Sequence, residues 1–210
     1  MIRVLIADDH SILRRGLAQI IAETEDMQVC GEAENGAQAV KFAREHPVDV
    51  VLLDITMPDR NGLDTLKQLK KEKPKLAVLM LSMHPEEIYA LRAIKAGASG
   101  YLNKASAPAL LVTAIRQVAG GRRYISPAVA EALAGTIADG ADRPPHAALS
   151  DREYETMRLI ASGKTVSEIA AEMSLSVKTV SVYRARLLQK MQLKNNSELT
   201  HYALKNQLVD

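Results

Sequence analysis

Five polar side chains in the first half of the sequence could together bind and accept a phosphoryl group. They are Asp8, Asp9, Asp54, Ser82 and Lys104, each at or just after the end of a short apolar run. Three carboxylates close together repel one another unless a hard cation neutralises them, and an oxygen-rich, partly hydrated site suits Mg²⁺. A carboxylate beside a metal ion, an ammonium and a hydroxyl can accept a phosphoryl group, because these neighbours stabilise its oxygens. Asp54 is the candidate nucleophile.

The apolar runs before these side chains are continuous, which is typical of buried parallel strands. We expect strands at residues 4–7, 29–31, 48–53, 76–81 and 98–102. The amphipathic stretches between them predict helices at residues 11–22, 36–46, 62–71, 85–96 and 106–119. This repeated alternation predicts a doubly wound, flavodoxin-like α/β domain with a five-stranded parallel sheet. Ligands bind beyond the carboxyl ends of such strands, where the five side chains would meet.

Each of these side chains, taken alone, has a simpler structural explanation. Asp8 and Asp9 suit the N-cap of a helix, and Asp54 suits a turn. Ser82 would then be a hydroxyl at a strand end, and Lys104 a surface charge. Their occurrence together at corresponding strand ends favours a functional site.

The segments around these side chains resemble the receiver domains of two-component response regulators. They are Leu5-Ile6-Ala7-Asp8-Asp9-His10, Leu52-Leu53-Asp54-Ile55-Thr56-Met57-Pro58 with Gly62, Leu79 to Ser82, and Tyr101-Leu102-Asn103-Lys104. The resemblance implies that Asp54 is phosphorylated by a cognate sensor histidine kinase. It also implies that Asp9, Asp54 and the Thr56 carbonyl bind Mg²⁺, for which Mn²⁺ can substitute, and that Asp8 assists through water.

The same resemblance assigns a switch to the fourth and fifth strands. Ser82 and Lys104 would contact the phosphoryl group, and Tyr101 would swing inward when Ser82 moves toward the phosphate. The alternative for Tyr101 is an ordinary half-buried tyrosine of a strand. We expect the phosphoryl group to shift an existing conformational equilibrium through this pair.

The second half of the sequence has no strand pattern and predicts an all-helical domain. We expect helices at residues 150–161, 165–173, 176–191 and 197–206, with capping boxes at Ser150 with Glu153 and at Thr165 with Glu168. The turn at Ser174 separates two helices with the proportions of a helix-turn-helix. We divide the chain into a receiver at 1–119, a linker at 120–148 and a DNA-binding domain at 149–210. The linker would include a short helix from 126 to about 134.

The helix expected at residues 176–191 has an apolar stripe and an opposite face that could enter a DNA groove. The stripe consists of Val180, Tyr183, Leu187 and Met191. Candidates for DNA contact are Lys178, Thr179, Ser181, Val182, Arg184, Ala185, Arg186 and Lys190, which combine small side chains with basic ones. The alternative is a solvated basic helix face, which charge runs usually are.

Three segments of this domain resemble the LuxR-type output domain of the NarL/FixJ class. They are Leu149-Ser150-Asp151-Arg152-Glu153, Ser167-Glu168-Ile169-Ala170 and Ser176-Val177-Lys178-Thr179-Val180. The resemblance implies that the recognition helix enters the major groove and that the helix at 197–206 pairs two subunits. An active homodimer on inverted-repeat DNA is therefore expected. Ser181 and Tyr183 stand where the family frequently has lysine and histidine, so its base-reading code does not transfer.

The composition agrees with a soluble regulator of two modest domains. The chain has 210 residues and a formal net charge of +2, which is too small to indicate nucleic acid binding without a local basic surface. Its single cysteine, Cys30, excludes an intramolecular disulfide and fits a reducing cytoplasm. No apolar stretch has the length of a signal peptide core or a membrane span, so we expect a cytoplasmic protein without a membrane partner.

Two other functions fit part of this pattern. A Mg²⁺-dependent phosphatase similar to the haloacid dehalogenases would also place Asp54 at a strand end, but it requires an aspartate where Thr56 stands. A DNA-binding protein with an inert receiver would not need the complete set of pocket residues. We therefore expect a transcription regulator that accepts a phosphoryl group and can lose it by autodephosphorylation. It would not be an enzyme that turns over an external substrate.

Overall fold

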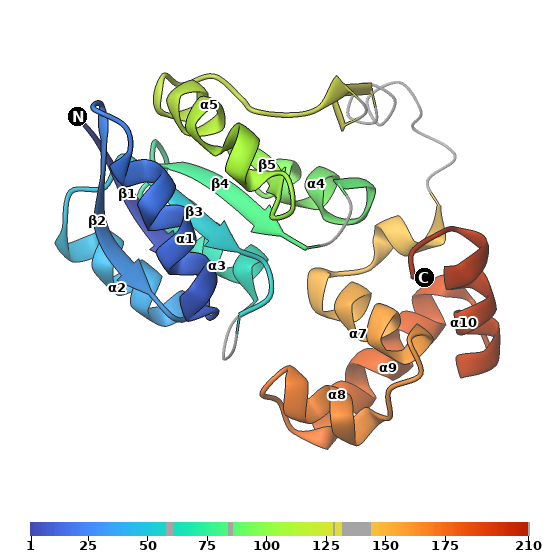
Figure 1. Ribbon diagram of the computed structural model, residues 1–210. Coiled ribbons are helices and arrows are strands. Elements are labelled where there is room, and N and C mark those ends of the chain that lie inside the picture. Colours follow the sequence, from blue (N-terminus) through green and yellow to red (C-terminus); the bar gives the residue numbers. More distant parts are fainter. Residues whose placement is uncertain (58–60, 84–85, 128, 132–143, 210) are drawn as a thin grey trace. The chain divides into compact units, whose positions relative to one another are not determined.

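The computed structural model describes residues 1–57, 61–83, 86–127, 129–131 and 144–209 (Figure 1). The chain divides into two compact units, Met1–Leu133 and Ala134–Asp210. Each unit has a core of its own.

The first unit contains a five-stranded parallel sheet in the order β2-β1-β3-β4-β5. The strands are β1 (Ile2–Ala7), β2 (Met27–Ala33), β3 (Val50–Asp54), β4 (Ala77–Ser82) and β5 (Gly100–Asn103). This order, with a switch between β1 and β3, is that of flavodoxin-like doubly wound sheets. The predicted fold class is therefore confirmed.

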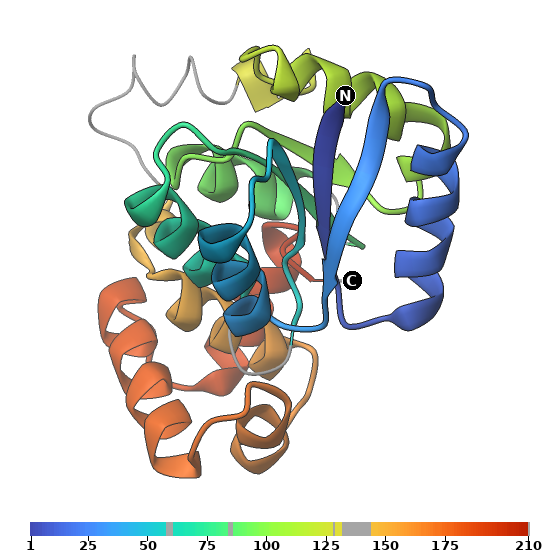
Figure 2. The same cartoon turned by 90° about the vertical axis from the view of Figure 1, so that its left-hand side faces the viewer.

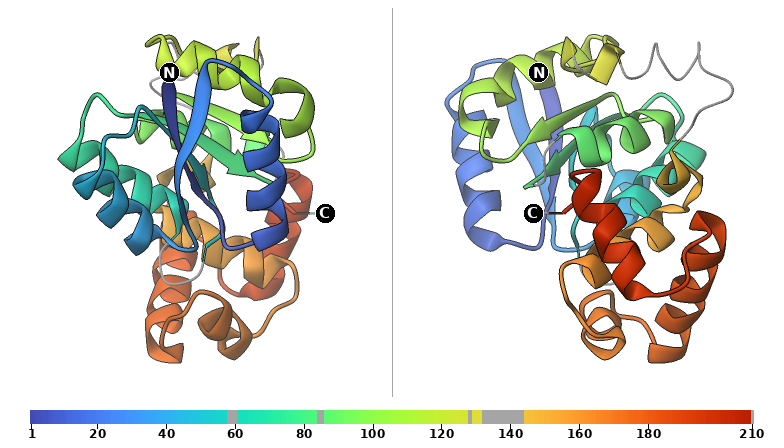
Figure 3. Two further views of the ribbon diagram at one scale, coloured as in Figure 1. Left: turned by 60° about the vertical axis from the view of Figure 1, so that its left-hand side comes forward. Right: turned by 90° about the vertical axis from the view of Figure 1, so that its right-hand side faces the viewer.

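Helices cover both faces of this sheet, as Figures 2 and 3 show. They are α1 (Ser11–Ala22), α2 (Gly36–Glu45), α3 (Gly62–Glu72), α4 (Glu86–Lys95) and α5 (Ala107–Ala119). Leu17 and Ile21 of α1 and Leu111 and Ile115 of α5 form one buried cluster with alternate strand residues, such as Ile6. The helices α2, α3 and α4 lie on the other face. Burial on both faces explains why the strands are continuously apolar.

The observed strands differ from the expected ones mainly at their ends. The second strand is longer than expected, because its whole length pairs with β1 from Ile2↔Met27 to Ala7↔Ala33. The third strand begins at Val50 instead of residue 48, and it ends at Asp54 instead of residue 53. These shifts leave Asp54 and Ser82 as the last residues of their strands.

In the described part of the second unit, helices and the turns between them make up the fold. It comprises the 3₁₀ turn η1 (Pro145–Ala148), α7 (Asp151–Ala161), α8 (Val166–Glu172), α9 (Val177–Met191) and α10 (Asn196–Lys205). Both predicted capping boxes are present, at Ser150 with Glu153 and at Thr165 with Glu168. The turn η1 lies in the segment expected to be linker. The helix expected at 126–134 is described in part: residues 127 and 129–131 are helical, and the remainder lies outside the described residues.

The core of the second unit forms where α7 packs against α9 and α10. Val180 and Leu187 are completely buried, Met191 is nearly so, and Tyr183 is half-buried. The predicted apolar stripe therefore faces the core, which turns the opposite side of α9 outward. Within the described chain, every helix is too short or too polar to cross a membrane.

Candidate functional site

Asp8, Asp54 and Lys104 form a buried triad at the carboxyl end of the sheet. Lys104 Nζ lies 2.7 Å from Asp8 Oδ2 and 2.8 Å from Asp54 Oδ2. All three residues are buried, because Asp8 follows β1, Asp54 ends β3 and Lys104 follows β5. The strand ends thus bring together residues that are distant in the sequence, as expected of a parallel sheet.

Burial dominates the electrostatics of Asp54. It raises the pKa of this carboxyl to about 6, because the charged form loses its hydration. Lys104 opposes this effect and Asp8 adds to it through charge repulsion. Burial by itself would lower the pKa of Lys104, but the two carboxylates raise it above its usual value, so the ammonium remains charged. Three carboxylates, counting Asp9, against this one ammonium leave the pocket with excess negative charge.

Asp9 and His10 form the exposed rim of the pocket. His10 Nδ1 lies 2.8 Å from Asp9 Oδ1 and 3.2 Å from Asp8 Oδ1, and the His10 amide donates to Asp8 Oδ1 at 2.8 Å. One ligand atom from each of Asp8, Asp9, His10 and Asp54 lies within 4.8 Å of the others. Ligands of one octahedral Mg²⁺ lie up to about 4.2 Å apart across the ion. The donor set therefore fits a metal ion after small movements.

His10 is a member of this site for which no role was expected from the sequence. Its position in the sequence could have indicated a role, because histidine is a common metal ligand and His10 directly follows two carboxylates expected to bind metal.

Backbone groups after β3 fix the orientation of Asp54. The Thr56 amide donates to Asp54 Oδ1 at 3.2 Å. The expected role of the Thr56 carbonyl as a metal ligand stays a prediction. The Gly62 amide donates to the Ile55 carbonyl at 2.8 Å. A Cβ atom at Gly62 would lie 2.0 Å from the Asp54 carbonyl oxygen, so only glycine allows α3 to begin this close to the strand end.

Arg14 is a second residue for which no role was expected, although it supports the backbone of Asp8. Its guanidinium donates to the Asp8 carbonyl at 2.8 Å and to Glu32 and Glu34 at 3.0 and 2.9 Å. Arg14 is in line with Leu17 and Ile21 on the buried side of α1, so it occupies a position where an apolar residue is usual. A charged residue in an otherwise apolar stripe was the signal that could have revealed it.

Ser82 and Tyr101, the expected switch pair, both lie buried, at the end of β4 and within β5. Each is 1% exposed. The Ser82 carbonyl accepts from the Lys104 amide at 2.8 Å, so the backbone at Ser82 is tied to the residue that faces Asp54. Tyr101 is fully buried rather than half-buried, and its amide donates to the Tyr124 carbonyl at 3.2 Å.

The outward side of α9 contains most of the residues expected to contact DNA. Lys178, Ser181, Val182, Ala185 and Arg186 are exposed, and Thr179 is half-buried with its hydroxyl 2.8 Å from that of Ser176. Val182 is 41% exposed although it is apolar. An exposed valine among small and basic residues offers apolar contact beside phosphate attraction.

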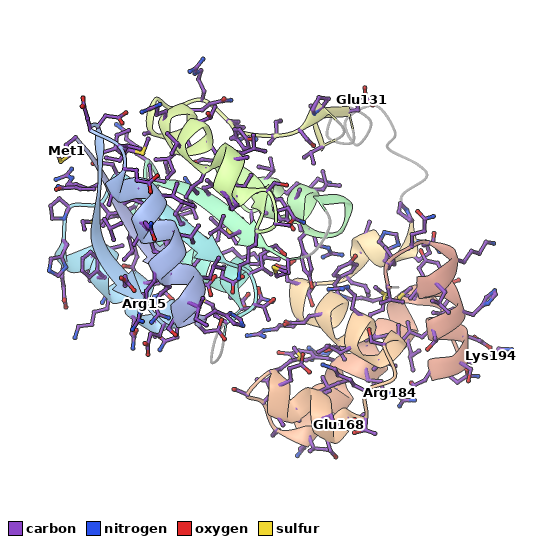
Figure 4. All side chains as sticks on the ribbon, in the orientation of Figure 1. Met1, Arg15, Glu131, Glu168, Arg184 and Lys194 are labelled. Carbon is purple, nitrogen blue, oxygen red and sulfur yellow. The ribbon has the colours of Figure 1, made fainter. Side chains whose placement is uncertain are left out.

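Arg184 and Lys190 are engaged within the second unit. Arg184, labelled in Figure 4, donates through Nε to Asn196 Oδ1 at 2.7 Å. Lys190 Nζ lies 2.6 Å from Glu153 Oε2, and Glu153 is 3% exposed and closes the capping box of α7. These partners are 12 and 37 residues away along the chain, so no local pattern could indicate them. The structure thus gives both residues a role inside the domain.

Two protein families match successive parts of the chain. The response regulator receiver domain matches residues 4–116, and the luxR family of bacterial regulatory proteins matches residues 147–203. The response regulator UvrY of Escherichia coli is 39% identical over all of this chain and 97% of its own length. The response regulator GacA of Pseudomonas aeruginosa is 37% identical over all of this chain and 99% of its own length.

Among solved structures, RcsB of Salmonella enterica bound to the promoter rprA in the presence of phosphomimetic BeF₃⁻ is similar. It has 26% sequence identity and a TM-score of 0.67, covering 96% of this chain and 97% of that one. The receiver triad, the helix-turn-helix and these full-length similarities agree with one another. The chain belongs to the two-component response regulators that carry a LuxR-type DNA-binding domain.

Proposed function

We propose that this regulator is switched by phosphorylation of Asp54, with a sensor histidine kinase as the phosphodonor. The observation that supports this most directly is the Asp54 carboxylate held 2.8 Å from the Lys104 ammonium at the carboxyl edge of the sheet. One Asp54 carboxylate oxygen attacks phosphorus, the bond between phosphorus and the kinase histidine nitrogen breaks, and the kinase imidazole leaves. Lys104 and the Ser82 hydroxyl stabilise the transferred oxygens. The protein keeps the phosphoryl group on Asp54 and passes it to no further substrate. Autodephosphorylation, in which water hydrolyses the acyl phosphate, releases inorganic phosphate and returns Asp54 to the resting state.

The proposal includes a divalent cation in the acidic pocket. Asp9, Asp54 and the Thr56 carbonyl would hold Mg²⁺ or Mn²⁺, with Asp8 acting through water. When bound, the ion offsets the charge of an entering phosphoryl dianion. One oxygen of each of Asp8, Asp9 and Asp54 lies within 4.8 Å of the others, which is consistent with such an ion.

We further propose that phosphorylation promotes dimerisation and operator binding through Ser82 and Tyr101. The RcsB structure with phosphomimetic BeF₃⁻ bound to promoter DNA supports a link between this chemistry and DNA, and another shows two RcsB dimers bound to two DNAs. In this chain α10 would pair two subunits, and the sites would be inverted repeats with half-site centres about 10 bp apart, or a multiple of that distance. The cytoplasm is the compartment that this function requires.

The DNA contacts proposed for α9 divide by chemistry. Lys178 and Arg186 would contact phosphates, whereas Ser181, Val182 and Ala185 would meet base edges and Thr179 would lie at the flank. Arg184 and Lys190 would approach phosphates only with atoms that their internal partners leave available. This arrangement belongs to the proposed DNA-binding domain at 149–210, after a receiver at 1–119 and a linker at 120–148.

Incubation with a small phosphodonor and Mg²⁺ tests the phosphoacceptor role. The proposal predicts about one phosphoryl group per chain, complete loss of labelling in Asp54→Asn and loss of labelling in chelator. Continuous hydrolysis of a phosphomonoester without accumulation of labelled chain would instead indicate a phosphatase. No labelling at all would indicate an inert receiver, and stoichiometric labelling of Asp54→Asn would place the acceptor on another carboxylate.

A further inference from the structure

His10 adds an imidazole nitrogen to the carboxylate oxygens at the mouth of the pocket. Its side chain is 66% exposed and makes no capping hydrogen bond to α1, so neither packing nor helix initiation explains its position. It lies instead between two carboxylates, with Nδ1 2.8 Å from Asp9 Oδ1 and 3.2 Å from Asp8 Oδ1. Over the described parts of the chain, no other group of His, Cys, Asp or Glu side chains brings three or more ligand atoms this close together.

Lys104 determines which carboxylate atoms face His10. The ammonium contacts the Oδ2 atoms of Asp8 and Asp54, which are buried and have no other partner among the described residues. Asp8 Oδ1 therefore faces the outer side of the pocket, together with Asp9 Oδ1 and His10 Nδ1. Arg14 holds the Asp8 backbone in place through its carbonyl. The result is a mixed oxygen and nitrogen donor set on a rigid support.

The type of ligand decides which ions such a site prefers. Mg²⁺ prefers oxygen ligands and retains several waters, whereas imidazole suits Zn²⁺ and its neighbours in the first transition row. We infer that His10 Nδ1 is a ligand of this site, beside Asp9, and that it makes the pocket bind Zn²⁺ more tightly than carboxylates alone would. Zn²⁺ then competes with Mg²⁺ for the site that serves Asp54. The inference rests on the metal site proposed above and adds the identity of a competing ion.

Calorimetric titration of the metal-free, full-length chain with Mg²⁺ and with Zn²⁺ tests this inference. His10→Asn removes the imidazole but retains a residue that is favourable at a helix N-cap, so α1 still begins at the same place. His46→Asn is the matched control, because His46 is an exposed histidine of the same unit that stacks on Phe42 at the end of α2.

We expect His10→Asn to weaken Zn²⁺ binding by at least about tenfold, since removal of an outer-shell partner alone costs about 10–100-fold. Mg²⁺ affinity changes by less than about twofold, because oxygen ligands and water supply its coordination. His46→Asn changes neither affinity. With Co²⁺ in place of Zn²⁺, the visible absorption spectrum of the parent chain shifts in His10→Asn, which reports the lost nitrogen directly.

Three results would contradict the inference in distinguishable ways. Unchanged Zn²⁺ affinity in His10→Asn, with Mg²⁺ still bound, overturns the role of His10 and leaves the proposed metal site intact. An equal loss for both ions shows that His10 shapes the pocket without selecting an ion. Failure of the parent chain to bind either ion overturns both the inference and the proposed metal site.

Discussion

The acidic pocket of the first unit and the outward face of α9 in the second unit place their functional groups in opposite environments. In the pocket, Asp8, Asp54 and Lys104 are buried and hold one another through short ion pairs. On α9, Lys178, Ser181 and Val182 are exposed. A buried set is coupled, so changing one member alters the others. Exposed residues contribute additively to the binding of a partner. Substitutions on the outward face of α9 should therefore change the affinity for DNA more than the stability of the domain.

Removal of the Lys104 ammonium from the buried pocket should cause the largest loss of stability. Lys104→Ala leaves two buried carboxylates uncompensated, and breaking a buried pair in this way costs about 3–5 kcal/mol. We expect the unfolding transition of the first unit to fall accordingly in urea at neutral pH. Arg44→Ala, which breaks an exposed ion pair with Glu72, is the matched control and should change stability far less. Equal losses in the two variants would show that burial does not distinguish the pocket.

Neutralising Asp54 should stabilise the folded protein, whereas removal of Lys104 destabilises it. Its pKa rises from 3.8 to about 6 on folding, so ionisation of Asp54 destabilises the folded protein as the pH increases through about 6. At about 1.4 kcal/mol per pKa unit, Asp54→Asn should stabilise the metal-free protein by up to about 3 kcal/mol at pH 8. The advantage should disappear below about pH 4, where Asp54 is protonated in both folded and unfolded states.

Chemical denaturation in chelator across this pH range measures the difference between Asp54→Asn and the parent chain. A constant difference, or an advantage confined to acid, would contradict the proposed environment of Asp54. Added Mg²⁺ should stabilise the parent chain more than the variant, because the variant lacks one carboxylate of the metal site.

On α9 we expect Val182 and Ser181 to determine which sequence is preferred. Both side chains are exposed, Val182 opposite the buried stripe and Ser181 at the flank of that outward side, where base edges would be within reach. Substitution of Val182 by Ala or of Ser181 by Asn should alter discrimination at one base pair by about 1–3 kcal/mol. Selection of binding sites from random DNA by each variant measures the change. An unchanged preferred half-site would mean that α9 is oriented differently in the groove.

Basic residues of the same helix should have smaller, sequence-independent effects. Lys178→Ala or Arg186→Ala should weaken binding to all DNA and lower the salt dependence by about one unit of slope per lost phosphate contact. Lys190→Ala should behave differently, because its partner Glu153 is buried and would lose its counter-charge. We expect this variant to lower the stability of the second unit more than the salt slope. The reverse pattern would show that Lys190 acts mainly on DNA.

The sequence was most informative where function follows a regular backbone. Continuous apolar runs place Asp54 and Ser82 at the ends of their strands and Lys104 directly after the last strand, and helical periodicity gives the buried and exposed sides of α9. Both predictions are local, and each tolerates an error of one or two residues in the element bounds, as occurred for β3.

What the sequence could not supply is contact between distant side chains. The support of Asp8 by Arg14 depends on the packing of α1, and the pairing of Lys190 with Glu153 depends on how α9 crosses α7. The rotamer of His10 is equally invisible in the sequence. Periodicity can nevertheless mark a residue for attention, as it does for a charged Arg14 on a buried helix face.

Operator affinity with and without phosphorylation tests the central claim that Asp54 controls DNA binding. Equilibrium binding of the parent chain and Asp54→Asn to a selected inverted-repeat site should be measured with Mg²⁺, before and after addition of a small phosphodonor, and dimerisation should be followed in the same samples. We predict that the phosphodonor increases both dimerisation and affinity in the parent chain and changes neither in Asp54→Asn. Equal affinity and equal dimerisation of the two proteins under phosphorylating conditions would contradict this account.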